Sequence, residues 1–189
     1  MKFRIPFRKR PPVVPVVRLA GVIGQVGAFR KGLTLDSVEP LLDRAFDIDD
    51  AKEVALVVNS PGGSPVQSEL IAGRIRALAL EKEKRVTAFV EDVAASGGYW
   101  LATAADEILL QGSSVVGSIG VISAGFGFTE AIAKLGIERR LYTAGESKAL
   151  LDPFSPEKPD DVARLKDIQE QIHANFIGQV NDRRGAKLI

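Results

Sequence analysis

Short apolar segments rich in β-branched residues alternate with helical segments along the chain, and this alternation constrains the fold more than any other feature. Residues 53–58, EVALVV, are the clearest case, because a near-continuous apolar run is typical of a strand buried on both faces. Ser37 is expected to cap the helix that precedes this strand. The expected strands are 13–24, 53–58, 85–90, 107–110, 120–123 and 137–142, and the expected helices are 37–46, a segment from Ser64 onward, 98–105, 129–135 and 160–182. The pattern predicts repeated β-α-β units, and therefore an α/β fold with a mainly parallel sheet flanked by helices.

Composition limits both the size of the domain and its chemistry. The chain has 189 residues, of which 46% are hydrophobic and 26% charged, as in a single soluble globular domain. It contains no cysteine, which excludes disulfides, thiolate nucleophiles and Cys-ligated zinc. Its one histidine, His173, cannot form a His-rich metal site. We expect neither a metal nor a cofactor.

The N-terminus is basic, whereas the rest of the chain is slightly acidic. Five Lys or Arg residues and no acid occur in residues 1–10, which leaves 20 basic against 24 acidic residues elsewhere. We therefore expect a basic arm at 1–12, ending in Pro11-Pro12, and a folded domain at 13–189. Such an arm is typical either of a solvated terminus or of a peripheral contact with an anionic membrane, and the sequence leaves both open. The acidic domain argues against nucleic-acid binding.

No segment resembles a membrane-spanning helix or a signal peptide. The most apolar stretch, 115–128, is interrupted by glycines and serines and falls short of the roughly 18 apolar residues that a span requires. The basic N-terminus has no apolar segment or cleavage site behind it. The expected location is the cytoplasm, with peripheral attachment at the inner membrane as the second option.

A glycine-rich turn, NSPGGSP, follows the buried strand at residues 59–65. Ser64 is a candidate N-cap, and Gln67 completes a capping box. Adjacent Gly62 and Gly63 before a helix N-terminus free backbone N–H groups to point at one spot, where an anion or the oxyanion of an acyl-transfer transition state would bind. The alternative is an ordinary strand–helix turn in which the glycines are only permissive, and this segment alone does not decide between them.

A second strand–turn–helix segment, AASGGYW at 94–100, places Ser96 between small residues. Small neighbours let a substrate carbonyl approach the hydroxyl, and the N–H of Gly97 can donate to the carbonyl oxygen. The layout parallels the nucleophile elbow of hydrolases without matching its G-x-S-x-G pattern. The alternative is that Ser96 simply caps the helix. A nucleophilic serine also needs a base. The only histidine, His173, is expected at the surface of a helix, so a serine–lysine pair is the remaining precedent for serine hydrolysis.

Together these motifs resemble signal peptide peptidase A, also called protease IV, a family of serine peptidases. The resemblance runs from about Val16 to near the end of the chain. It is carried by NSPGGS (59–64), EDVAASGGYWLATAAD (91–106), GSSVVGSIGVI (112–122) and YTAGESKALLDPFSPE (142–157). It implies a ClpP/crotonase-like α/β fold without metal or nucleotide. It also implies an oxyanion hole formed by the N–H groups of Gly63 and Gly97, with Gly62 shaping the turn.

The same resemblance implies a catalytic dyad. Ser96 would be the nucleophile and Lys148, in GESKA, the general base, while Ser118, in GSIG, matches the family serine that hydrogen-bonds to the lysine and orients it. The Lys148 amine must be largely neutral to accept a proton, which an apolar surrounding favours. Glu146 and Asp152 would oppose this, so we expect both carboxylates to point away, with neighbouring leucines or bound substrate covering the amine.

The chain departs from the family pattern at both ends. Many members begin with a membrane-spanning anchor, whereas this sequence shows only the basic arm. The chain stops at Ile189, soon after the last long helix, so we expect the peptidase domain to be truncated at its C-terminus.

The resemblance therefore predicts a serine endopeptidase that hydrolyses signal-peptide remnants or other short hydrophobic peptides through an acyl-enzyme. The resemblance implies a homo-oligomer, because family members form rings or domes. One alternative is a crotonase-like acyl-CoA enzyme, which would share the fold and the oxyanion site but need neither Ser96 nor Lys148. Another is a non-catalytic oligomeric scaffold of the same fold.

Overall fold

The computed structural model of the chain describes residues 12–25, 27, 32–145 and 148–187. It consists of two compact units, Met1–Ile119 together with Gly178–Ile189 as unit 1, and Gly120–Ile177 as unit 2. The peptidase domain expected at 13–189 spans both units. Apart from Pro12, the expected basic arm lies outside the described residues.

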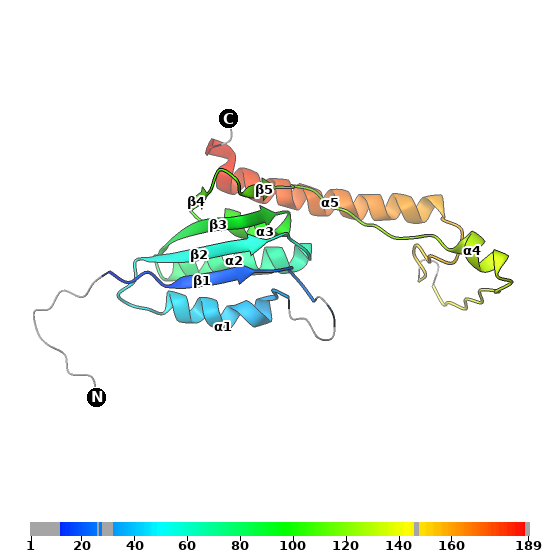
Figure 1. The fold of residues 1–189 in the computed structure, drawn as a ribbon, viewed down its shortest axis with the longest axis horizontal. Coiled ribbons are helices and arrows are strands. Elements are labelled where there is room, and N and C mark those ends of the chain that lie inside the picture. The colour runs from blue at the N-terminus through cyan, green and yellow to red at the C-terminus, as the bar shows by residue number, and fades with distance from the viewer. Residues whose placement is uncertain (1–11, 26, 28–31, 146–147, 188–189) are drawn as a thin grey trace, which may run out of the picture. The chain divides into compact units, whose positions relative to one another are not determined.

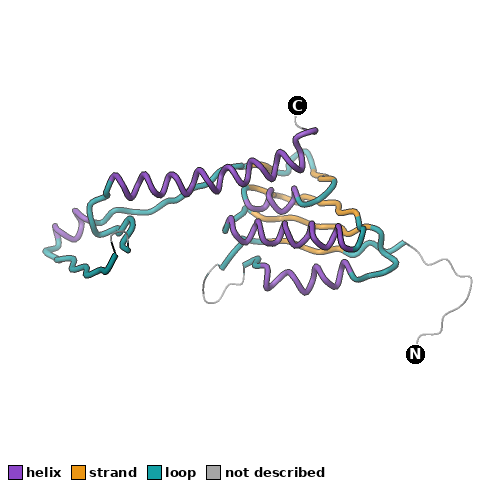
Figure 2. The backbone as a smooth tube through the Cα atoms, turned by 180° about the vertical axis from the view of Figure 1, so that it is seen from behind, coloured by secondary structure: helices purple, strands orange, loops and turns teal. Residues whose placement is uncertain are grey.

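Unit 1 is built on a parallel sheet with three helices on one face (Figures 1 and 2). The order of hydrogen-bonded strands is β1-β2-β3-β4, and β5 pairs with the end of β3. The strands are β1 (Val16–Ala20), β2 (Glu53–Ser60), β3 (Arg85–Ala95), β4 (Glu107–Leu110) and β5 (Val115–Gly117). The helices are α1 (Leu35–Phe46), α2 (Pro65–Glu81) and α3 (Gly97–Thr103). The predicted α/β class, with β-α-β units and a parallel sheet, is confirmed.

The core of unit 1 lies between the sheet and these helices. Val17 and Leu19 of β1 are buried while Val16 and Arg18 are exposed, because successive side chains of a strand point to opposite faces. Full burial of a large apolar side chain contributes about 1.5–3 kcal/mol. The largest such side chains come from strands and helices alike: Phe46, Leu19, Leu42, Leu56, Ile71, Ile75 and Leu101. This packing holds the ends of β2 and β3, from which the candidate site is built.

The starts of α1 and α2 differ in part from the sequence prediction. Thr34, not Ser37, is the N-cap of α1. The two residues form a capping box, in which Ser37 N–H donates to Thr34 Oγ1 at 3.3 Å and Thr34 N–H to Ser37 Oγ at 3.0 Å. Ser64 caps α2 as predicted, accepting from Gln67 N–H at 3.4 Å. The Gln67 side chain does not close a box, because it accepts from Leu35 N–H at 2.8 Å and so joins the starts of the two helices.

Unit 2 has less regular structure than the sequence predicts. It contains α4 (Thr129–Lys134) and most of α5 (Pro159–Arg184), whose last residues belong to unit 1 and lead into the short 3₁₀ helix η1 (Gly185–Lys187). Residues 120–123 and 137–142, predicted as strands, are irregular. A strand is stabilised by pairing with a neighbour, and no strand among the described residues pairs with either segment. None of the described helices is long and apolar enough to cross a membrane.

Asp106 links three parts of unit 1. Its carboxylate accepts from Val86 N–H at 2.9 Å and pairs with Arg76 of α2 at 2.9 Å and with Arg183 of α5 at 3.0 Å. Arg183 also donates to the carbonyl of Thr103 at 3.2 Å. Burial acts to raise the pKa of Asp106, but the hydrogen bonds from Val86 and Arg183 and the charges of the two arginines outweigh it and hold the pKa below its ordinary value.

We expect Asp106→Asn to lower the free energy of unfolding by about 1–3 kcal/mol, because both arginines lose a partly buried counter-charge. The folded-state pKa is lower than the unfolded one, so this stabilisation is present above the unfolded-state pKa and is lost as pH falls through the folded-state pKa. In urea titrations the difference in the free energy of unfolding between the wild type and Asp106→Asn should therefore become smaller at acidic pH. Glu138→Gln, which breaks the exposed pair with Arg140, is the matched control and should be nearly neutral. Equal effects of the two substitutions would contradict the prediction.

Candidate active site

Ser96 stands between β3 and α3 in a strained backbone conformation, with φ 52° and ψ −122°. For a residue other than glycine such a conformation costs on the order of 1–3 kcal/mol and persists only where the surroundings impose it. Ser96 occupies the N-cap position of α3, yet its side chain makes no capping hydrogen bond. A role as a simple helix cap therefore does not account for the strained backbone of Ser96. Its half-buried hydroxyl forms no hydrogen bond with any described residue.

The NSPGGS turn lies against the Ser96 turn at a spacing that only glycine allows. An ideal Cβ on Gly62 would lie 2.8 Å from the carbonyl oxygen of Ala95 and from Ser96 Cβ. A Cβ on Gly63 would overlap the backbone of Ile23. Both glycines have positive φ, 99° and 147°. The two turns therefore depend on Gly62 and Gly63 for their contact, beyond general permissiveness.

The N–H groups of Gly63 and Gly97 form the candidate oxyanion site. Ile23 forms backbone hydrogen bonds with both neighbours of Gly63. Its N–H donates to Gly62 O at 2.9 Å, and its carbonyl accepts from Ser64 N–H at 2.9 Å. Gly63 and Gly97 are neighbours, since an ideal Cβ on Gly97 would lie 3.4 Å from the Gly63 nitrogen. Neither N–H donates to an acceptor within the described part of the chain. Two uncommitted donors beside a serine hydroxyl can hold the oxyanion of an acyl-transfer transition state.

Ser118 follows β5 and lies next in sequence to a residue that contacts the Ser96 turn. Ser96 N–H donates to Gly117 O at 2.7 Å, and Ala95 pairs with Gly117 in the sheet. Ser118 is exposed and has a positive φ of 55°. Five of the six predicted site residues thus belong to unit 1: Gly62, Gly63, Ser96, Gly97 and Ser118.

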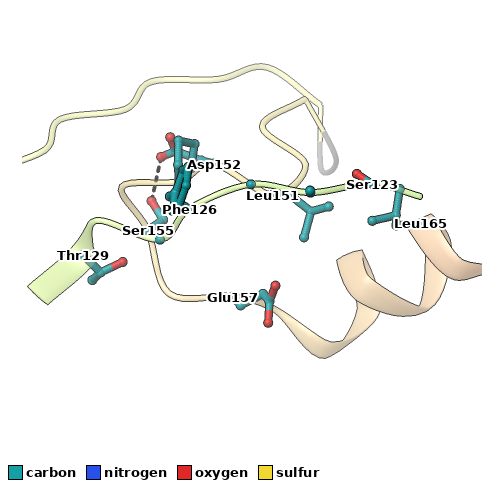
Figure 3. Close-up of a pocket in the computed structure, with 12 residues that line it drawn as sticks. Ser123, Phe126, Thr129, Leu151, Asp152, Ser155, Glu157 and Leu165 are labelled. Atoms are coloured by element: carbon teal, nitrogen blue, oxygen red, sulfur yellow. Dashed lines mark hydrogen bonds between the residues drawn. The ribbon is translucent and has the colours of Figure 1, made fainter. Parts of the chain in front are cut away.

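Lys148, the sixth, belongs to unit 2. Its side chain is exposed and forms no ion pair with a described residue, so the expected covering by neighbouring leucines is not found. Asp152 points its carboxylate elsewhere, as predicted. It accepts from Ser155 Oγ at 2.8 Å (dashed line in Figure 3) and pairs with Arg139 at 3.4 Å. These contacts lower the pKa of Asp152. Glu146 lies outside the described residues.

A cavity of about 530 Å³ opens within unit 2 along the segment that follows Lys148, and the sequence did not predict it. Leu151, in its lining, has a positive φ of 53°, which no sequence pattern would indicate. Figure 3 shows the carboxylate of Glu157 and the side chain of Leu151 among the labelled lining residues. The lining consists of Ser123, Ala124, Gly125, Phe126, Gly127, Thr129, Leu151, Asp152, Pro153, Ser155, Glu157 and Leu165.

The sequence profile of peptidase family S49 matches residues 78–188, more than half of the chain. The chain belongs to peptidase family S49. The matched range contains Ser96, Ser118 and Lys148 and begins after the NSPGGS turn. The resemblance to signal peptide peptidase A is confirmed, since proteins named "Serine protease SPPA, chloroplastic" and "Protease 4" are among the relatives of this S49 chain.

Three relatives illustrate the similarity. A Brucella abortus protein named "Na(+)/H(+) antiporter NhaA" is 55% identical over 183 residues, which are 96% of this chain and 25% of that protein. "Putative protease MJ0651" of Methanocaldococcus jannaschii is 36% identical over 76% of this chain and 46% of its own length. "Serine protease SPPA, chloroplastic" of Arabidopsis thaliana is 31% identical over 78% of this chain and 23% of its own length. The chain thus spans between about a quarter and a half of these relatives.

The solved structure of a membrane-bound stomatin-specific protease overlaps 88% of this chain and 65% of its own, at 17% sequence identity and a TM-score of 0.45. An overlap at this level adds nothing to the fold assignment, which rests on the strand order and pairing of unit 1.

Proposed function

We propose that this S49 chain is a serine endopeptidase that uses Ser96 as nucleophile and Lys148 as general base. The observation that carries the proposal is the strained Ser96, whose uncommitted hydroxyl stands beside the N–H groups of Gly63 and Gly97. Membership of a peptidase family adds the reaction class. The substrates we propose are signal-peptide remnants or other short hydrophobic peptides, and the working form is a homo-oligomer.

The reaction proceeds through an acyl-enzyme. Ser96 Oγ attacks the scissile carbonyl carbon while Lys148 Nζ takes the hydroxyl proton, and the oxyanion accepts hydrogen bonds from the two glycine N–H groups. The tetrahedral intermediate collapses, the C–N bond breaks, and Lys148 returns the proton to the leaving amine. Water then attacks the Ser96 ester by the same route and releases the acid. Ser118 orients the lysine amine.

A fluorophosphonate probe, which phosphonylates activated serines, tests the assignment of Ser96. We expect the wild-type chain to be labelled and Ser96→Ala to be unlabelled and inactive on peptides, because the attacked oxygen is gone. Ser113→Ala, at an exposed loop serine, is the matched control and should label like the wild type. Mass spectrometry of the labelled peptide identifies the site. An unlabelled wild-type protein would reject the proposal, and the scaffold or acyl-CoA alternatives would then stand.

The antiporter name of the Brucella relative belongs to a protein of which this chain matches one quarter. We carry no transport activity over to this chain.

A further inference from the structure

β3 contains a bulge just before Ser96. The ladder pairs that flank it are Val58 with Val90 and Ser60 with Ala94. Three residues of β3, 91–93, therefore lie opposite a single residue of β2, Asn59. A bulge of this kind disrupts the ladder and re-aims the strand, and bulges are over-represented next to active sites.

Side chains replace the backbone hydrogen bonds that the bulge removes. Asn59 Oδ1 accepts from Val93 N–H at 3.3 Å, and Asn59 Nδ2 donates to Asp92 Oδ2 at 2.8 Å. On the other side of β3, Ser114 Oγ donates to the carbonyl of Glu91 at 2.6 Å. The N–H of Val93 and the carbonyl of Glu91 are thus satisfied by side chains distant in sequence. This indicates a bulge specified by the sequence rather than a local irregularity.

The bulge fixes where Ser96 meets the glycine turn. Beyond it, β3 pairs again on both edges, through Ser60 with Ala94 and through Ala95 with Gly117. Each residue advances a strand by about 3.3 Å, so without the two extra residues Ser96 would be displaced by roughly 7 Å along the strand. The contact between Ser96 and Gly62 depends on this offset.

We propose that Asn59 is a positioning residue, which holds the β3 bulge together with Asp92 and so places Ser96 beside the oxyanion N–H groups. The catalytic consequence rests on the proposed function of Ser96, whereas the bracing of the bulge does not. Neither residue belongs to the dyad or the oxyanion site described above.

The chemistry of Asn59 and Asp92 makes the proposal testable by swapping the two side chains. Asn59 must accept from Val93 N–H and donate to Asp92 at the same time, which an amide can do and a carboxylate cannot. Asn59→Asp loses the donor and places two carboxylates in contact. Asp92→Asn keeps an oxygen that can accept from Asn59. The double variant Asn59→Asp/Asp92→Asn keeps an acceptor for Val93 N–H and restores the bond between positions 59 and 92 with donor and acceptor exchanged.

The experiment measures the rate of fluorophosphonate labelling at Ser96, and kcat and KM for a peptide, in these three variants of the full chain. We expect Asn59→Asp to lower the labelling rate and kcat by about 10- to 100-fold with KM little changed, because a misplaced nucleophile slows the chemical step. Asp92→Asn should stay within about threefold of the wild type, and the double variant should regain at least tenfold over Asn59→Asp. Ser114→Ala removes the bond to the Glu91 carbonyl and the one that Ser114 Oγ accepts from Gln111 N–H at 3.1 Å. It provides a milder variant if Asn59→Asp does not fold, and should slow labelling by about 3- to 10-fold.

Wild-type labelling by Asn59→Asp, or a double variant no faster than Asn59→Asp, would overturn the proposal. Thermal unfolding of each variant separates loss of fold from loss of position. If the wild type itself is not labelled, the proposed function has failed. Hydrogen exchange at the Val93 amide still tests whether Asn59 and Asp92 hold the bulge. Repulsion between the two carboxylates of Asn59→Asp should move the acceptor oxygen at position 59 away from Val93 N–H, so this amide should exchange faster in this variant and slowly again in the double variant. Unchanged exchange would show that Asn59 and Asp92 do not hold the bulge.

Discussion

Replacing Lys148 with alanine is expected to lower peptide turnover by about 10³-fold or more, because the Ser96 hydroxyl loses the base that takes its proton. The fold should be unaffected. The Lys148 side chain is exposed and forms no ion pair with a described residue. Its removal therefore leaves no cavity in the core and breaks no ion pair with these residues. The measurements are kcat for a fluorogenic peptide and the thermal unfolding midpoint.

Two further variants separate a base from a mere positive charge. Lys148→Arg keeps the charge but cannot give up its proton, so it should be as inactive as Lys148→Ala. Lys158→Ala removes another exposed lysine of unit 2 and should keep wild-type turnover. Near-normal rates in Lys148→Ala, or activity retained by Lys148→Arg, would show that another group accepts the proton.

Features of unit 1 that depend on neighbouring residues could be predicted from the sequence. The apolar run at 53–58 gives β2, and Ser64 with Pro65 gives the start of α2. The glycine turn at the end of β2 and the small-residue turn holding Ser96 come together because parallel strands β2 and β3 present their carboxyl ends at the same edge of the sheet. Local periodicity and turn chemistry were sufficient for these elements.

Features that depend on distant residues could not be predicted. The bulge in β3 arises from the register with β2 and from the bond between Asn59 and Asp92, which are 33 residues apart. Ser37 has the chemistry of an N-cap, but Thr34 takes that position and Ser37 becomes its capping-box partner. The apolar residues at 120–123 suggested a strand, yet pairing decides whether such a segment becomes one.

Gly63→Ala is the second substitution for which we expect a large effect, a loss of at least about 10²-fold in kcat together with a lower unfolding temperature. An alanine Cβ would overlap the carbonyl oxygen of Ile23, and the φ of 147° is unfavourable for any residue with a Cβ. Ile23 cannot easily yield, because it is buried and bonded to Gly62 and Ser64. The turn must therefore shift, and the Gly63 N–H moves away from the position of the oxyanion.

Gly73→Ala is the matched control, because this exposed glycine in α2 has no heavy atom within 4 Å of an added Cβ. It should keep wild-type turnover and raise stability by up to about 1 kcal/mol, since alanine favours a helix. For Gly63→Ala we expect an unfolding midpoint lower by roughly 5–10 °C, with kcat still reduced at temperatures where the variant is fully folded. The loss of rate in the folded variant is the decisive observation. If folded Gly63→Ala turns over peptide like the wild type, the oxyanion is held elsewhere, and the close contact at Gly63 serves only to join the glycine turn to the segment that follows β1.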